Sequence, residues 1–190
     1  MKMRVIAGKY KGRKLNSPED SSVRPTTDKA KEALFSILTN EICGARVLDL
    51  FAGTGGLGIE ALSRGADYCL FADSSRKSLG LIKSNLEHCG VEEKTRVAAG
   101  DYAKILKNLG LRIEEGLEEP FDIIFLDPPY DAGYMDEAFR LIREGRVLAE
   151  DGIIVAEHRK HEELPEVLHG FEKAKERRYG VVKLSIYNNM

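Results

Sequence analysis

The chain has 190 residues, which is enough for one substantial hydrophobic core and leaves no room for a second full domain. Hydrophobic residues make up 43% and charged residues 32%, a composition typical of a soluble globular protein. The net charge of -2 hides an uneven distribution, because residues 1–14 carry six basic side chains and no acid, which leaves the other residues at about -8.

Targeting and metal-binding signals are absent from the sequence. No apolar run is suited to a secretory signal, and none approaches the length of a membrane span, so we expect a cytoplasmic protein with no membrane contact. The cysteines show no C-x-x-C spacing and the histidines no metal-ligand spacing, so we expect reduced thiols and no metal. These residues are Cys43, Cys69, Cys89, His88, His158, His161 and His169.

The N-terminal part is predicted to be a basic arm over residues 1–27, and residues 28–190 are predicted to form one domain. Charge alone favours a solvated tail, but apolar residues alternate with the basic ones between Val5 and Leu15, which favours a small β-hairpin. An amphipathic helix is expected to begin near Asp28.

Strand-like and helix-like patterns then alternate along the chain. Apolar runs of strand length occupy residues 46–51, 68–73, 95–101, 121–127 and 152–160, and helical patterns occupy residues 56–65, 75–90, a stretch ending near Leu109, and residues 134–145. Such alternation predicts a parallel sheet covered by helices on both faces, an α/β fold. Two β-rich runs with a Tyr-Gly turn between them fill residues 171–188 and predict a hairpin, which requires an antiparallel strand.

A glycine-rich segment, VLDLFAGTGGLGIEAL, follows the first predicted strand. Gly53, Gly55 and Gly58 satisfy G-x-G-x-x-G, so an NAD-dependent oxidoreductase has to be considered. Asp49 argues against it, because a carboxylate beside this loop would repel a pyrophosphate. The same carboxylate suits a cationic ligand.

S-adenosylmethionine is such a ligand, since its methionyl end carries an ammonium and a sulfonium. Three acidic strand ends then have a use: Asp49 toward the methionyl end, Asp73 toward the ribose hydroxyls and Asp101 toward the adenine edge. The competing interpretation is that Asp73 and Asp101 only cap the helices that follow. The predicted cofactor-binding residues are Asp49, Phe51, Gly53, Gly55, Gly58, Asp73 and Asp101.

A second motif, FDIIFLDPPYDAGY, delivers Asp127 to the end of a strand that two prolines stop. A ring-conjugated amine is a poor nucleophile, and the Asp127 carboxylate and the Pro128 carbonyl can accept its two N–H bonds and orient its lone pair. Tyr130 is placed to stack on an unstacked base. The motif is also compatible with a simple turn. The predicted catalytic residues are Asp127, Pro128, Pro129 and Tyr130.

Together these motifs resemble the class I S-adenosylmethionine-dependent amino-methyltransferases, through VLDLFAGTGGLGIEALSRGA and LDPPY. The start RVIAGKYKGRKL…VRPTTDKAKEALFSIL narrows the resemblance to the RsmD family, bacterial 16S ribosomal RNA guanine N2-methyltransferases. This resemblance implies a Rossmann-like, seven-stranded, mostly parallel sheet with an antiparallel terminal hairpin strand. It also implies a guanine 2-amino target in a partly assembled small-subunit particle. Asp73 departs from the glutamate that related enzymes often carry there.

The target base stays open from the residues alone, because adenine and cytosine amines pose the same problem to the tetrapeptide. A DNA adenine-N6 or cytosine-N4 methyltransferase is therefore the alternative, although no separate target-recognition domain fits in the chain. RNA recognised by its shape suits the basic arm better. The predicted RNA-binding residues are Lys9, Lys11, Arg13, Lys14 and Arg24.

Overall fold

The computed structural model describes residues 3–18, 28–129 and 133–190 and consists of two compact units, Met1–Gly100 and Asp101–Met190. Tyr130 and Arg24, both predicted site residues, lie outside the described residues. Within the described ranges no helix is long and apolar enough to cross a bilayer.

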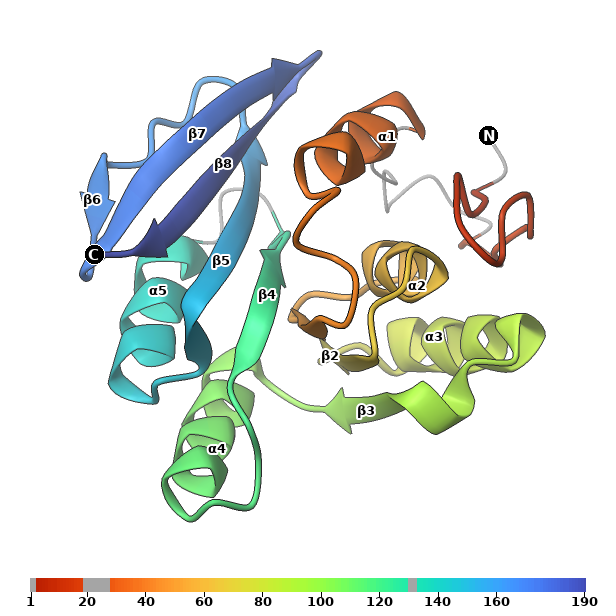
Figure 1. Ribbon diagram of the computed structural model, residues 1–190, viewed down its shortest axis with the longest axis horizontal. Coiled ribbons are helices and arrows are strands. Elements are labelled where there is room, and N and C mark those ends of the chain that lie inside the picture. The colour runs from red at the N-terminus through yellow and green to blue at the C-terminus, as the bar shows by residue number, and fades with distance from the viewer. Residues whose placement is uncertain (1–2, 19–27, 130–132) are drawn as a thin grey trace. The chain divides into compact units, whose positions relative to one another are not determined.

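The first unit contains three parallel strands in the order β3-β2-β1, with α2 and α3 packed against them (Figure 1). Asp49, the last residue of β1, pairs in register with Phe71, and Asp73 at the end of β2 pairs with Ala99 of β3. The carboxyl ends of these strands therefore lie at one edge. The elements are α1 (Asp28–Ile37), β1 (Arg46–Asp49), α2 (Gly56–Ser63), β2 (Tyr68–Asp73), α3 (Arg76–Cys89), a 3-10 turn η1 (Glu92–Lys94) and β3 (Thr95–Ala99).

The second unit contains five strands in the order β4-β5-β8-β7-β6. β4 and β5 are parallel, and β8, β7 and β6 add to them in antiparallel fashion, so the predicted terminal hairpin is confirmed. α4 and α5 pack side by side (Figure 1). The elements are α4 (Tyr102–Glu114), β4 (Phe121–Leu126), α5 (Tyr134–Glu144), β5 (Leu148–Arg159), β6 (Val167–Leu168), β7 (Phe171–Tyr179) and β8 (Val182–Asn189).

The predicted α/β class is confirmed, with three differences in detail. The strands number eight in the described residues instead of seven, because the two-residue β6 pairs with β7. α4 continues past the predicted end near Leu109 to Glu114, since its polar residues occupy the exposed face of the helix until Gly116 adopts a left-handed φ of 70°. β5 begins at Leu148, which pairs with Phe121 across a register shift.

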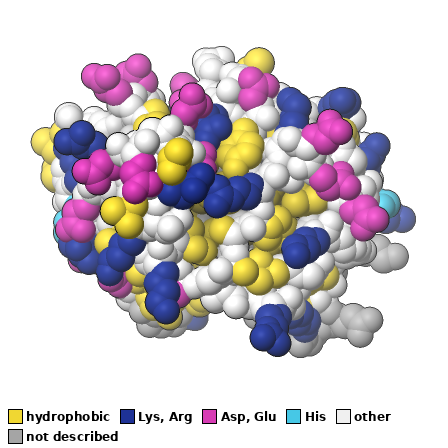
Figure 2. Space-filling view, turned by 90° about the horizontal axis from the view of Figure 1, so that it is seen from below, with side chains coloured by type: hydrophobic (Ala, Val, Ile, Leu, Met, Phe, Trp, Pro, Cys, Tyr) yellow, Lys and Arg dark blue, Asp and Glu magenta, His cyan; other side chains and the backbone are white. Residues whose placement is uncertain are grey.

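The buried core is mainly aliphatic and aromatic, and several of its largest side chains come from the strands. In the second unit, Phe139 of α5 makes edge-on contacts with Phe171 and Tyr187, at centroid distances of 5.8 and 4.9 Å. These contacts attach α5 to the antiparallel part of the sheet. On the surface shown in Figure 2, basic and acidic side chains are interspersed, with hydrophobic side chains visible between them.

Candidate functional site

The glycine-rich loop between β1 and α2 has the backbone that its sequence predicts. Gly53 and Gly55 have φ values of 57° and 78°, a left-handed region that favours glycine. A Cβ on Gly58 would lie 2.3 Å from Cε1 of Phe71 and 2.6 Å from Sγ of Cys69. Glycine at position 58 therefore lets the start of α2 approach β2 closely.

Asp49 lies under this loop and is 2% exposed. Its Oδ2 accepts a hydrogen bond of 3.0 Å from the amide of Gly58. Burial raises the pKa of Asp49 to about 7, the Gly58 amide opposes the rise, and the charge of Asp73 adds to it. A nearby cation would favour the ionised form, so this carboxyl is suited to a positively charged ligand.

Asp73 and Asp101 have different local roles. The carboxylate of Asp73 accepts from the amides of Gly53 at 2.9 Å and Ser75 at 2.8 Å, so it ties the glycine-rich loop to the end of β2. Ser75, not Asp73, is the N-cap of α3. Asp101 is the N-cap of α4, since its Oδ1 accepts from the amides of the next turn. The capping interpretation therefore fits Asp101 but not Asp73.

Asn85 of α3 supports the glycine-rich loop, and the sequence analysis did not identify it. Its Nδ2 donates to the carbonyl oxygens of Thr54 at 2.9 Å and Asn16 at 3.0 Å, and its Oδ1 accepts from the Asn16 amide at 2.7 Å. The Asn85 side chain is fully buried. A lone asparagine in a helix carries no sequence pattern that would have revealed these contacts.

At the carboxyl end of β4, Asp127 follows the last strand residue directly, as predicted. Asp127 is half-buried, Pro128 is buried and Pro129 is exposed. Phe51, the remaining predicted cofactor residue of the first unit, is half-buried in the loop after β1.

The basic N-terminal segment, residues 3–18, is anchored to α2 through Glu60. The fully buried carboxylate of Glu60 accepts from the amides of Ile6 at 2.8 Å and Ala7 at 3.0 Å. It also lies 3.3 Å from the buried ammonium of Lys31 and 2.8 Å from Nε of Arg64. Sequence reasoning missed this cluster, because the partners of Glu60 lie up to 54 residues away from it in the chain.

Four of the predicted RNA-binding residues lie in this segment and are exposed: Lys9, Lys11, Arg13 and Lys14. An antiparallel bridge joins Arg4 to Lys14. The Lys9 ammonium and the Arg13 guanidinium lie 5.5 and 5.2 Å from the centre of the Tyr10 ring. The segment therefore presents cations beside an aromatic face, a combination that suits nucleic acid.

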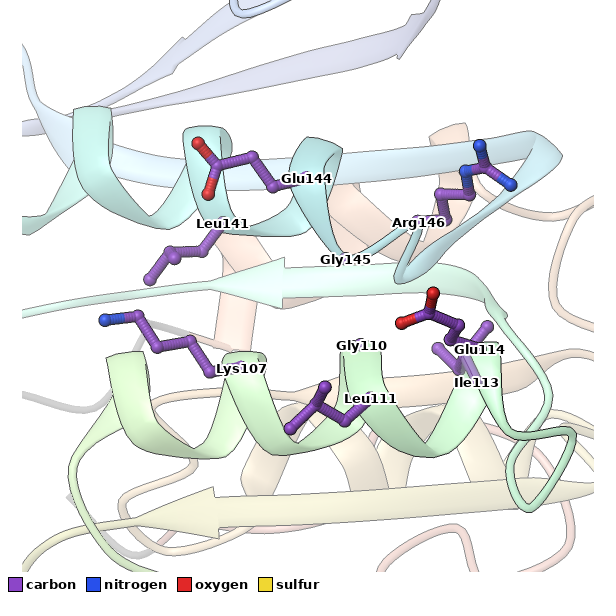
Figure 3. Close-up of a pocket in the computed structure, with 9 residues that line it drawn as sticks. All are labelled: Lys107, Gly110, Leu111, Ile113, Glu114, Leu141, Glu144, Gly145 and Arg146. Carbon is purple, nitrogen blue, oxygen red and sulfur yellow. The ribbon is translucent and has the colours of Figure 1, made fainter.

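A cavity of about 640 Å³ lies between α4 and α5 of the second unit. Lys107 and Leu141 extend toward one another there (Figure 3). The two helices can approach closely because Gly110 has no Cβ. A Cβ at this position would lie 2.7 Å from Cα of Gly145. The cavity contains none of the predicted site residues. Its lining residues are Lys107, Gly110, Leu111, Ile113, Glu114, Leu141, Glu144, Gly145 and Arg146.

Comparison with known proteins decides the family. A family model described as "Conserved hypothetical protein 95" matches residues 3–188. The chain belongs to this family, the RsmD family of methyltransferases. "Putative rRNA methyltransferase YlbH" of Bacillus subtilis is 43% identical, over 97% of this chain and 98% of that protein. "Ribosomal RNA small subunit methyltransferase D" of Escherichia coli K12 is 32% identical, over 97% of this chain and 89% of that protein.

Solved structures agree with the RsmD assignment. The structure of "Putative methyltransferase yhhF from Escherichia coli" has a TM-score of 0.84 and 30% identity, covering 100% of this chain and 98% of that one. The predicted methyltransferase fold is therefore confirmed. Among the described residues, no group of histidine, cysteine and acidic side chains could hold a metal ion.

Proposed function

We propose that this RsmD-family protein transfers a methyl group from S-adenosylmethionine to the exocyclic 2-amino group of a guanine in small-subunit ribosomal RNA. The observation that carries the proposal is the near full-length similarity to the Escherichia coli enzyme named for that RNA, at 32% identity. The amine-binding motif Asp127-Pro128-Pro129 at the end of β4 supplies the chemistry.

The donor set of the first unit fits the cofactor. Asp49 supplies a buried carboxyl for the cationic methionyl end, and Asp73 keeps further lone pairs for ribose hydroxyls beyond the two amides that it binds. Left-handed glycines leave the loop without side chains that would block a ligand. Asp101, the first residue of the second unit, is the remaining proposed ligand, toward the adenine edge. When bound, the cofactor supplies a methyl group on a sulfonium, and transfer leaves a neutral thioether.

The second unit supplies the groups that hold the nucleophile. Asp127 and the Pro128 carbonyl accept the N–H bonds of the guanine amine and orient its lone pair for attack. The nitrogen forms the new N–C bond and releases one proton, for which the Asp127 carboxylate is an acceptor. Tyr130 is proposed to stack on the flipped base.

Methyl transfer from labelled S-adenosylmethionine tests the proposal. Small ribosomal particles, naked ribosomal RNA and duplex DNA are incubated separately with the protein, and the methylated nucleoside is identified. N2-methylguanine in ribosomal RNA supports the proposal, whereas methyladenine or methylcytosine in DNA overturns it. Asp127→Ala should abolish most turnover while the cofactor dissociation constant stays within about tenfold.

A further inference from the structure

Glu157 is a buried acidic side chain beside the amine-binding motif. Leu126, the last residue of β4, pairs in register with Ala156 of β5, so Asp127 directly follows β4 at the position that matches Glu157 on β5. Side chains at matching positions of neighbouring strands leave the sheet on the same face. The two carboxylates therefore belong to the same face at the carboxyl end of the β4–β5 pair.

Two neighbours of Glu157 on that face are apolar. Val155 precedes it by two residues, and Leu184 is its partner on β8. Both are buried, and Glu157 itself is 6% exposed. A carboxylate in such a place costs stability even when it is paired, so burial alone does not account for it. Buried ionisable side chains that lower stability are common at functional sites.

Hydrogen bonds on the opposite face of β5 hold the carboxyl end of this strand in place. His158 Nε2 lies 2.9 Å from Ser185 Oγ, which in turn donates to Glu176 at 3.0 Å. Because Ser185 donates to Glu176, His158 donates from Nε2, and this chain of hydrogen bonds joins β5, β8 and β7. Glu157 is therefore presented from a rigid strand rather than from a mobile loop, as precise recognition requires.

Base chemistry gives this carboxylate a use. In guanine, N1 lies beside the 2-amino group on the Watson–Crick edge and carries a hydrogen, so N1 and the amine present two adjacent N–H donors. In adenine and cytosine the ring nitrogen beside the amine is an acceptor. An acceptor-only carboxylate next to the group that holds the amine attracts guanine and opposes the other two bases.

We propose that Glu157 is the specificity-determining residue that accepts the N1–H of the target guanine, while Asp127 and Pro128 hold its 2-amino group. This inference rests on the proposed function, since it assumes that an exocyclic amine is methylated. It adds the basis for choosing guanine, which the tetrapeptide alone does not provide.

The test compares guanine with 2-aminopurine, which keeps the 2-amino group but has an unprotonated N1. The methylated nucleotide is first mapped, and small ribosomal particles are then reconstituted with either base at that position. The ratio of kcat/KM for guanine to that for 2-aminopurine is measured for the wild type, Glu157→Gln and Glu157→Asp. Glu172→Gln, an exposed glutamate on β7, is the matched control.

The wild type should prefer guanine by about 100-fold or more, because the wrong base turns a lone pair at N1, and not a donor, toward the Glu157 carboxylate. Glu157→Gln should lower this ratio at least about tenfold, since its amide N–H can donate to the bare N1 of 2-aminopurine. Glu157→Asp retains an acceptor-only group and should keep the preference at a reduced rate. 2-Aminopurine also lacks the C6 carbonyl of guanine. This difference affects all the variants alike, so it cancels when their guanine-to-2-aminopurine ratios are compared.

The outcomes separate this inference from the proposed function. If the wild type forms N2-methylguanine but Glu157→Gln keeps the wild-type ratio, only the role of Glu157 is overturned. If the wild type methylates no guanine amine, both fail. Should Glu157→Gln not fold, Glu157→Asp decides. A retained preference for guanine over 2-aminopurine in this variant supports the role of the carboxylate, and a lost preference contradicts it.

Discussion

The carboxylate of Asp49 accepts a hydrogen bond of 3.0 Å from the amide of Gly58, which links the end of β1 to the first turn of α2. Through this bond the residue proposed to face the cofactor cation also helps to hold the glycine-rich loop. Asparagine can accept the same bond without the charge, so Asp49→Asn separates the electrostatic role from the structural one.

Cofactor affinity should depend on pH through Asp49. Its pKa is raised to about 7 in the free protein, and a bound cation lowers it, so binding below that pH must release a proton. The affinity for S-adenosylmethionine should therefore fall by up to about tenfold per pH unit below pH 7. Calorimetry between pH 5.5 and 7.5 measures this slope.

The control for this dependence is Asp49→Asn, which should bind more weakly and lack the slope. The cofactor's own ammonium is present in both measurements, so the difference between the two proteins isolates Asp49. Equal slopes in the two proteins would contradict the assignment of Asp49 to the cationic end.

The free energy of unfolding should also depend on pH through Asp49. The direction of this dependence is opposite to that of a salt-bridged aspartate. Because its pKa is higher in the folded chain than the 3.8 of the free side chain, the folded protein holds an extra proton between pH 3.8 and about 7. The wild type therefore loses stability as pH rises through this window. Asp49→Asn should gain stability relative to the wild type over the same range, which chemical denaturation at pH 5 and 8 can measure.

Close packing at Gly58 gives a steric prediction. A methyl group there would lie 2.3 Å from the Phe71 ring, so Gly58→Ala should cost about 1–3 kcal/mol of unfolding free energy and weaken cofactor binding. At Gly80, in α3, an added methyl group would meet no atom within 4 Å, and Gly80→Ala should instead stabilise the protein by up to about 1 kcal/mol. Thermal and chemical unfolding of the two variants compare them directly. Equal stabilities of the two variants would show that the first turn of α2 can shift to admit a side chain.

The features recovered from the sequence are those encoded over a short stretch of chain. The glycine-rich loop and the end of β4 at Asp127 each arise from neighbouring residues with defined backbone requirements. Helix α4 was predicted too short because its last turn mixes an exposed leucine, Leu111, with polar residues, so the helical periodicity is weak there. Asn85 and Glu60 could not be predicted, since their partners lie up to 69 and 54 residues away.

The buried cluster around Glu60 should be important for stability. Glu60→Ala leaves the ammonium of Lys31, which is 3% exposed, without its carboxylate, and removing one partner of a buried pair costs about 3–5 kcal/mol. It also removes the acceptor for the amides of Ile6 and Ala7, so limited proteolysis should cut the N-terminal segment faster. Glu87→Ala, at an exposed position in α3, is the control and should change stability by less than about 0.5 kcal/mol. Unchanged proteolysis of Glu60→Ala would show that other contacts hold the segment.

The basic segment is predicted to bind ribosomal RNA through side chains that can be removed without disturbing its backbone. Deleting residues 1–14 is a poor test, because Met3 Sδ accepts a hydrogen bond of 3.2 Å from Thr54 in the glycine-rich loop, and the deletion should weaken cofactor binding as well. Replacing Lys9, Lys11 and Lys14 with alanine instead removes three exposed charges and leaves the buried Val5 and Leu15 in place.

This triple variant should bind ribosomal RNA more weakly while its affinity for S-adenosylmethionine stays unchanged. Each phosphate contact that is lost should flatten the plot of log affinity against log salt by about 0.7 to 0.9, so the slope counts the contacts. Lys94→Ala is the control, because the Lys94 ammonium lies 3.6 Å from the carboxylate of Asp67 and is already paired. A triple variant with the wild-type affinity and salt slope would exclude these three lysines from RNA binding, and the recognition surface would have to be sought at Arg13 or beside Asp127.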